Sequence, residues 1–151
     1  MRPYAGKTVR LSGTLIYRDN QSMIELVKGS VSVVADAHQV PAPPTDLGTF
    51  DLAGEIVDGK CYLGVMNPGN GKVHRDCAVR CLSGGIPPIF ATNDFRGIPA
   101  ILVLTDVAGN PLPKQSFLNL LAQPVRVHGK VVQAGDTLFL ETEPAGVSTL
   151  P

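Results

Sequence analysis

Residues 124–142, PVRVHGKVVQAGDTLFLET, are the stretch that decides the fold class of this chain. Residues 124–133 alternate between polar and apolar side chains around a central glycine, and residues 137–142 are rich in residues that favour strands. The segment between them, AGD at 134–136, is prone to turn. Alternation with a period of two is typical of a half-buried strand, and two strand-like runs separated by a few residues that include glycine predict a β-hairpin.

The first half of this hairpin is similar to two earlier segments of the chain. Val125–Gly129, VRVHG, aligns with VRLSG at Val9–Gly13 and, more weakly, with FDLAG at Phe50–Gly54. Each segment carries a glycine in the middle of a predicted strand. Small barrels place glycine where a strand must bend sharply, so the repeat predicts several bent strands of one kind.

The N-terminal copy begins a second hairpin. Strand patterns over 8–17 and 22–27 flank a polar turn, so residues 1–37 are predicted to form an N-terminal β-hairpin segment. Residues 38–48 include three prolines, which lack the N–H that a central strand needs, and they are predicted to form an exposed connector. We predict that residues 49–151 form the main unit, a barrel that carries a cluster of cysteine and histidine.

Between the two hairpins, short strand patterns alternate with short helical ones. Strands are predicted over 50–57, 89–92 and 100–105, and helices over 74–82 and 116–122. A meander of short bent strands with an inserted helix before the last hairpin is typical of a small closed barrel of the OB type. The predicted fold class is therefore all-β, a small OB-like barrel with one or two short helices and an N-terminal β-hairpin.

Composition narrows the classes of function. The chain has 151 residues, of which 44% are hydrophobic, which suits one compact domain. Its 13 basic residues balance 13 acidic ones and it has no Trp, so nucleic acid is not a predicted partner.

No apolar run reaches the roughly 18 residues of a membrane span, and the chain as given is predicted to be soluble. If Met1 is not the natural start, a location outside the cytoplasm or at a membrane is favoured.

All three cysteines and one histidine gather in one stretch, Cys61, His74, Cys77 and Cys81, with the spacing C-x12-H-x2-C-x3-C. If the segment from His74 onward is helical, its three donors lie at i, i+3 and i+7 on one face. Three thiolates and an imidazole form a tetrahedral zinc site, and they also suit copper or iron, which rank lower here. Asp58 is a candidate to orient His74 by accepting a hydrogen bond from the imidazole, although an Asp at a strand end more often caps a turn.

Two other interpretations of the cysteines are open. A disulfide between Cys61 and either Cys77 or Cys81 would pin the helix to the preceding strand, in a barrel that binds other proteins. Alternatively, His74 beside Cys77 would activate a thiol for redox chemistry. No oxyanion-stabilising or orienting partner is evident, so an enzyme is not favoured.

The motifs around this cluster resemble those of a bacterial family. Gly54–Cys61, His74–Cys81 and Gly84–Pro88 match the pattern G-x-[IV]-x-D-x-x-C, H-x-x-C-A-x-x-C, x-x-G-G of a group of uncharacterised OB-like bacterial proteins. The resemblance covers roughly residues 50–142. It implies an OB-like fold, frequent export or membrane tethering, and a partner protein in a bacterial membrane or envelope system. It implies no reaction.

Overall fold

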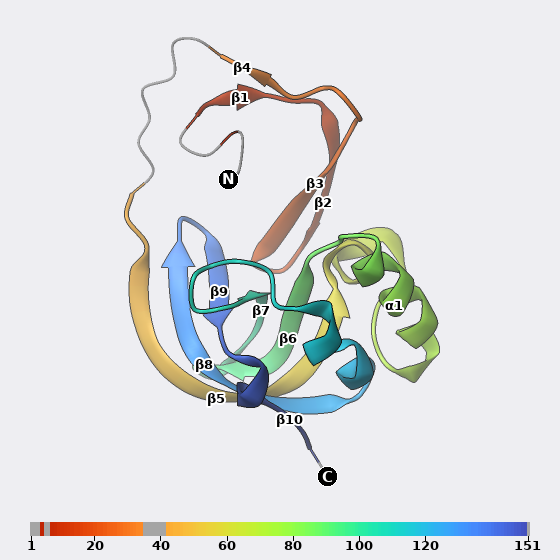
Figure 1. Cartoon of the computed structure of the whole chain (residues 1–151), viewed down its shortest axis with the longest axis vertical. Helices are drawn as coiled ribbons and strands as arrows, with labels where there is room; N and C mark the ends of the chain where they lie inside the picture. The colour runs from red at the N-terminus through yellow and green to blue at the C-terminus, as the bar shows by residue number, and fades with distance from the viewer. Residues whose placement is uncertain (1–3, 5–6, 35–41, 151) are drawn as a thin grey trace.

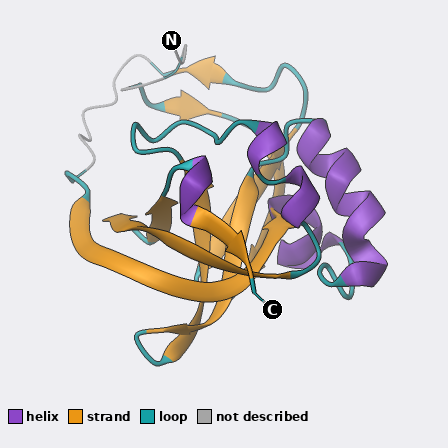
Figure 2. Ribbon diagram, turned by 60° about the horizontal axis from the view of Figure 1, so that its bottom comes forward, coloured by secondary structure: helices purple, strands orange, loops and turns teal. Residues whose placement is uncertain are grey.

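The computed structural model describes residues 4, 7–34 and 42–150, so part of the predicted connector lies outside the described residues. The strands are β1 (Val9–Arg10), β2 (Gly13–Arg18), β3 (Gln21–Leu26), β4 (Ser32–Val33), β5 (Thr45–Asp58), β6 (Pro88–Phe95), β7 (Ile98–Thr105), β8 (Pro124–Ala134), β9 (Thr137–Glu141) and β10 (Val147–Thr149). The helical elements are η1 (Cys61–Val65), η2 (Lys72–His74), α1 (Arg75–Ser83), η3 (Lys114–Ser116), η4 (Leu118–Leu120) and η5 (Pro144–Gly146). Strands dominate, and the helical elements are short (Figure 2).

Five strands close into a barrel (Figure 1). The order around the wall is β8, β5, β6, β7 and β9, and β9 returns to pair with β8. All neighbours are antiparallel except β7 and β9, which run parallel. A closed barrel of this kind with a few short helices confirms the predicted all-β, OB-like fold class.

The longest wall strand, β5, extends further than predicted. It begins at Thr45 rather than residue 50, and so takes in the last part of the predicted connector. Thr45 pairs with Gln133 and Asp46 with Val132 on β8, and a bulge between Asp46 and Gly48 shifts the register there. The edge of β8 supplies a partner for this segment, and the bulge absorbs a residue that strand periodicity alone would not accommodate.

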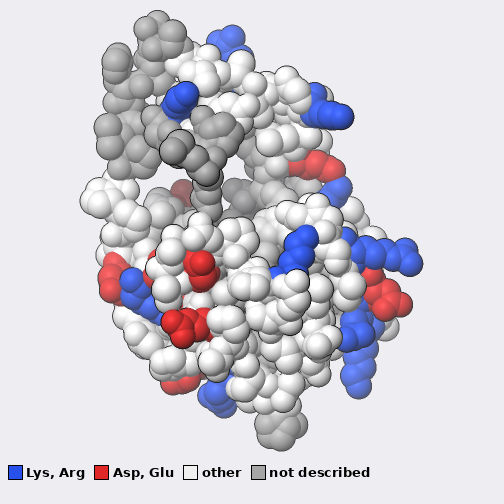
Figure 3. All heavy atoms as spheres, in the orientation of Figure 1, with Lys and Arg blue, Asp and Glu red and all other residues white. Residues whose placement is uncertain are grey.

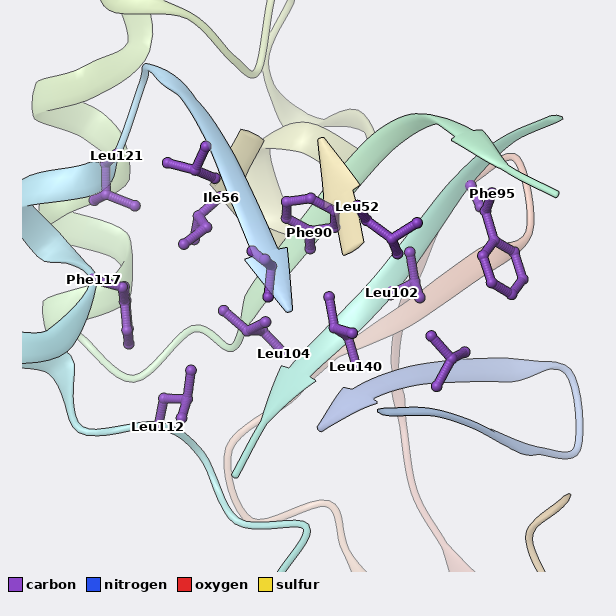
Figure 4. Close-up of a cluster of buried hydrophobic side chains, with 14 of the residues drawn as sticks. Leu52, Ile56, Phe90, Phe95, Leu102, Leu104, Leu112, Phe117, Leu121 and Leu140 are labelled. Carbon is purple, nitrogen blue, oxygen red and sulfur yellow. The ribbon is translucent and has the colours of Figure 1, made fainter. Parts of the chain in front are cut away.

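The interior of the barrel is the main hydrophobic core (Figure 4). Side chains from the wall strands point inward, among them Ile56, Phe90, Leu102 and Leu140, each of which is fully buried. Residues between β7 and β8, including Phe117, pack against the same cluster. Along β8 buried and exposed residues alternate, as the sequence pattern predicts.

The repeated glycines have a steric reason. A Cβ at Gly129 would lie 2.5 Å from the Glu141 carbonyl oxygen on β9, and one at Gly54 would lie 2.2 Å from the Ala91 carbonyl oxygen on β6. The third copy, Gly13, meets the Glu25 carbonyl oxygen at 2.5 Å. In each case the neighbouring strand approaches so closely that no side chain fits.

The N-terminal hairpin β2–β3 packs by its tip against the outside of the barrel. Ile16 and the partly buried Met23 join a second apolar cluster with Ile89 on β6 and Ile101 on β7. The side-chain amide of Asn20 donates to the Ile101 carbonyl and accepts from its N–H, both at 2.9 Å. This amide thus pairs with the β7 backbone as a strand residue would.

Both predicted helices differ in detail from the structure. The segment predicted over 74–82 is a 3-10 turn, η2, followed by α1, and His74 is the last residue of that turn. The segment predicted over 116–122 is not α-helical but forms the 3-10 turns η3 and η4. Instead of capping the N–H groups that follow, Ser116 Oγ donates back to the Pro113 carbonyl at 2.6 Å.

Within the described residues, no helix has the length and apolarity to cross a bilayer.

Candidate metal centre

The predicted site residues come from three consecutive segments at one corner of the barrel. Asp58 is the last residue of β5, and Cys61 begins the turn η1 three residues later. His74 ends η2, while Cys77 and Cys81 lie one turn apart on α1. Backbone pairing with β6 holds β5 as far as Asp58, so the rigid wall of the barrel fixes one side of the site.

The three sulfur atoms lie close together. Cys61 Sγ is 3.8 Å from Cys77 Sγ and 3.8 Å from Cys81 Sγ, and all three sulfurs lie within 4.8 Å of one another. All three cysteines are free, because a disulfide needs sulfurs about 2.05 Å apart. Cys61 is buried, whereas Cys77 and Cys81 are partly exposed, so the cluster is accessible from the α1 side.

His74 lies near the cluster but in a different grouping. Its imidazole, Asp58 and Cys61 place their donor atoms within 4.8 Å of one another, and no such group joins His74 to Cys77 or Cys81. The segment from His74 onward is not one continuous α-helix, as the shared face would require, because His74 ends the 3-10 turn that precedes α1. The two groups overlap only at Cys61.

Asp58 uses both carboxylate oxygens inside the barrel corner. Oδ1 accepts the N–H of Cys61 at 2.7 Å, and Oδ2 lies 2.9 Å from His74 Nε2. Asp58 is fully buried and His74 is 3% exposed, so this pair is shielded from solvent. Both roles considered for Asp58 are therefore present at once, since it caps the turn at Cys61 and holds the imidazole. Because Asp58 engages Nε2, Nδ1 is the ring nitrogen that could meet an ion.

The surroundings disfavour free thiolates. Burial, followed by the negative charge of Asp58, raises the pKa of the Cys61 thiol well above its ordinary value. The same two causes raise the pKa of Cys81. Lys60 interacts electrostatically with Cys61 and Cys81, but it also pairs with Glu25 of the hairpin. A bound cation would reverse this preference, because coordination favours the thiolate.

Two loop residues that the sequence did not mark as functional support the site. A Cβ at Gly69 would lie 2.6 Å from the Tyr62 Cα and 2.7 Å from the Cys61 carbonyl oxygen, so only glycine fits against this turn. The N–H of Gly71 donates to Glu55 Oε1 on β5 at 2.7 Å, which ties the loop to the wall. The glycines themselves were the only signal, and glycines are equally typical of an unconstrained turn.

Comparison of the chain with models of protein families, with curated proteins and with solved structures finds no match. The resemblance to the bacterial family with the cysteine and histidine motif therefore stays a prediction.

Proposed function

We propose that this protein is a metal-binding module whose ion, zinc foremost, is held by the thiolates of Cys61, Cys77 and Cys81. His74, oriented by Asp58, is the proposed fourth ligand through Nδ1. The role of the ion is structural, and the module serves as an accessory to another protein, for which the motif resemblance favours a bacterial envelope system.

The spacing of the sulfurs carries this proposal. A zinc–sulfur distance of about 2.3 Å at tetrahedral angles separates neighbouring sulfurs by about 3.8 Å. Cys61 Sγ lies at 3.8 Å from each of the other two sulfurs. Buried thiols packed only as small apolar groups would have no reason to converge from a turn and a helix on one point.

Chemistry ranks the candidate ions. Sulfur-rich sites select zinc, copper(I) and iron over magnesium or calcium, which need oxygen donors. Zinc accepts three sulfurs and one nitrogen without a strong geometric preference of its own. With four protein ligands the site has no position for a reactive water, so this set favours stabilisation over hydrolysis.

A structural ion would cross-link two elements that are separated by a loop without regular structure. It would join the turn after β5 to α1 across the loop at 66–71, which has neither helix nor strand. In metal sites of this kind, binding energy contributes directly to folding energy. We therefore expect α1 and the loop to depend on the ion more than the barrel wall does.

The test is metal analysis of protein purified without added oxidant. One zinc per chain is expected, and replacement by Co²⁺ should give the visible absorption of a tetrahedral sulfur-rich site. Cys77→Ser should lose most of the affinity. His74→Ala should weaken binding about 10- to 100-fold, whereas the matched control His128→Ala, an exposed histidine paired with Asp51, should leave it unchanged. Absence of stoichiometric metal with three reactive thiols would overturn the proposal.

A second candidate is a disulfide staple, in which Cys61 pairs with Cys77 or Cys81. The equal 3.8 Å separations favour neither partner over the other. Forming the bond would need an external disulfide as oxidant, and one free thiol would remain. Thiol counting without reductant distinguishes the two candidates, because the metal site predicts three titratable thiols after chelation and the staple predicts one.

A fast redox thiol is less favoured, since the pKa values of Cys61 and Cys81 are raised.

A further inference from the structure

The N-terminal hairpin has one apolar face that its own fold does not use. In the β2–β3 register Leu15 lies opposite Ile24, Tyr17 opposite Ser22, and Gly13 opposite Leu26. Strand alternation puts these six residues on one face, which we call the outer face. Its four large side chains are exposed, Leu15 by 60%, Tyr17 by 72%, Ile24 by 46% and Leu26 by 50%.

The opposite face of the hairpin accounts for its attachment to the barrel. Ile16 and Met23, an opposed pair in the same register, reach the second apolar cluster, and Asn20 at the tip bonds to β7. No residue in the described part of the chain buries the four large side chains of the outer face. In the monomer this apolar surface is in contact with water, and its side chains contribute no burial to the stability of the fold.

We infer that the outer face is an interface between two copies of this chain, which pack hairpin against hairpin about a twofold axis. The exposed fractions correspond to roughly 400 Å² of apolar surface per copy, which is at the limit of what a soluble monomer leaves uncovered. Two copies together with the small residues and backbone of the face would bury about 1,000 Å², the lower bound for a specific interface. A weak, reversible dimer is therefore expected.

The arrangement of large and small residues on this face is self-complementary. Under a twofold axis parallel to the strands, each β2 residue faces the β3 residue that is its register partner in the other copy. Tyr17 then covers the small Ser22, and Leu26 covers Gly13. Leu15 meets Ile24, two aliphatic side chains of the same volume, at the centre of the contact.

Charge does not oppose this association. None of the six residues on the outer face is charged, and a stacked pair of sheets buries only the facing side chains. The charged residues of the two strands, Arg18 and Glu25, lie on the other face of the hairpin, where Arg18 donates to the Tyr62 carbonyl and Glu25 pairs with Lys60. Formation of the dimer therefore does not remove any charged side chain of this face from water, so it avoids the cost of desolvating an ion.

Sedimentation equilibrium of the full chain between about 1 and 200 µM tests this interface. A monomer–dimer equilibrium is expected, and Tyr17→Ser with Leu15→Ser should raise its dissociation constant at least tenfold. The matched control Val107→Ser removes an equally exposed apolar side chain, 66% exposed, from outside the hairpin and should change nothing. Ser22→Glu provides a second variant, which keeps the apolar area but places a charge opposite Tyr17 of the other copy.

Three results would overturn the inference. The first is a monomer throughout this range, and the second is a dimer that the hairpin variants leave intact. The third is flotation of the monomeric chain with phosphatidylcholine vesicles that is lost in Tyr17→Ser, which would assign the face to a lipid surface. Circular dichroism confirms that each variant folds. None of the substituted residues belongs to the cysteine cluster, so metal binding is measured as a separate readout and is expected to stay unchanged.

Discussion

The two hairpins of this protein share a sequence pattern but differ in burial. In β8–β9 the side chains of Val125, Val127, Val131 and Leu140 are completely buried. In β2–β3 only Ile16 and Gln21 are buried, and the other face is open to solvent. The C-terminal hairpin pairs with β5 and β7 as part of the closed wall, whereas among the described strands the two of the N-terminal hairpin pair only with each other. Alternation thus specifies a strand, and closure of the barrel decides how much of it is buried.

Truncation of one core residue in each hairpin should give the largest contrast. Leu140→Ala leaves a cavity inside the closed barrel and should lower the free energy of unfolding by about 3–4 kcal/mol. Ile16→Ala, at the edge of the smaller cluster, should cost about 2 kcal/mol, because the hairpin can settle against the barrel surface. Denaturant unfolding measures both. Equal losses would mean that the docked hairpin is as rigid as the wall.

The aligned glycines sharpen the comparison with a smaller effect. Gly129→Ala and Gly13→Ala each place a Cβ 2.5 Å from a carbonyl oxygen of the neighbouring strand. On β8 the strand is paired on both sides and cannot shift, so a loss of about 2–3 kcal/mol is expected. On β2 the hairpin can splay, and we expect about 1 kcal/mol. Thermal unfolding of both variants checks the order, which a larger loss in Gly13→Ala would reverse.

The cysteine cluster, which lies between the two hairpins in the sequence, predicts that the stability of the metal-free protein depends on pH. Because the pKa of Cys61 is raised in the folded state, the folded protein keeps this proton while the unfolded chain loses it above about pH 9. The stability from this group is complete below that pH and falls as pH rises, by up to about 1.4 kcal/mol per pH unit. Unfolding of chelator-treated protein from pH 7 to 10 measures the slope. Cys61→Ser should lose much of it, and an unchanged slope would contradict the assignment.

The attachment of the N-terminal hairpin predicts a local effect. Asn20→Ala removes two hydrogen bonds and leaves the backbone of Ile101 unpaired there, at a cost of about 1–2 kcal/mol. Hydrogen exchange should accelerate across β2 and β3 and stay unchanged in β8 and β9. Asn119→Ala, which alters an exposed asparagine, is the matched control. Uniform acceleration over the whole chain would show that the hairpin and the barrel unfold as one unit.

Much of the fold was predictable because it depends on local alternation. The hairpin 124–142 and the glycine repeat predicted a closed barrel. The observed strands β8 and β9 end within one residue of the predicted positions. The start of β5 was missed because prolines and a bulge interrupt the pattern there. The bond between Asn20 and Ile101 was not predictable either, because no local pattern links residues so distant in the chain.

The candidate site was predictable in composition but not in geometry. Cys61, Cys77 and Cys81 converge as their spacing suggested. The contact between His74 and Asp58 was also predicted. The grouping of His74 apart from Cys77 and Cys81 was not, because the 3-10 turn before α1 depends on how the loop packs, as at Gly69, and no local periodicity encodes that packing.

The parallel pairing of β7 with β9 has a consequence for how the protein is made. On the side of β7 that faces away from β6, residues 103–105 pair with 139–141, so the wall stays open on the ribosome until β9 has emerged. The thiols at 61, 77 and 81 leave the exit tunnel well before that moment. Nascent chains therefore pass through a period in which these thiols lack the shelter of the finished barrel.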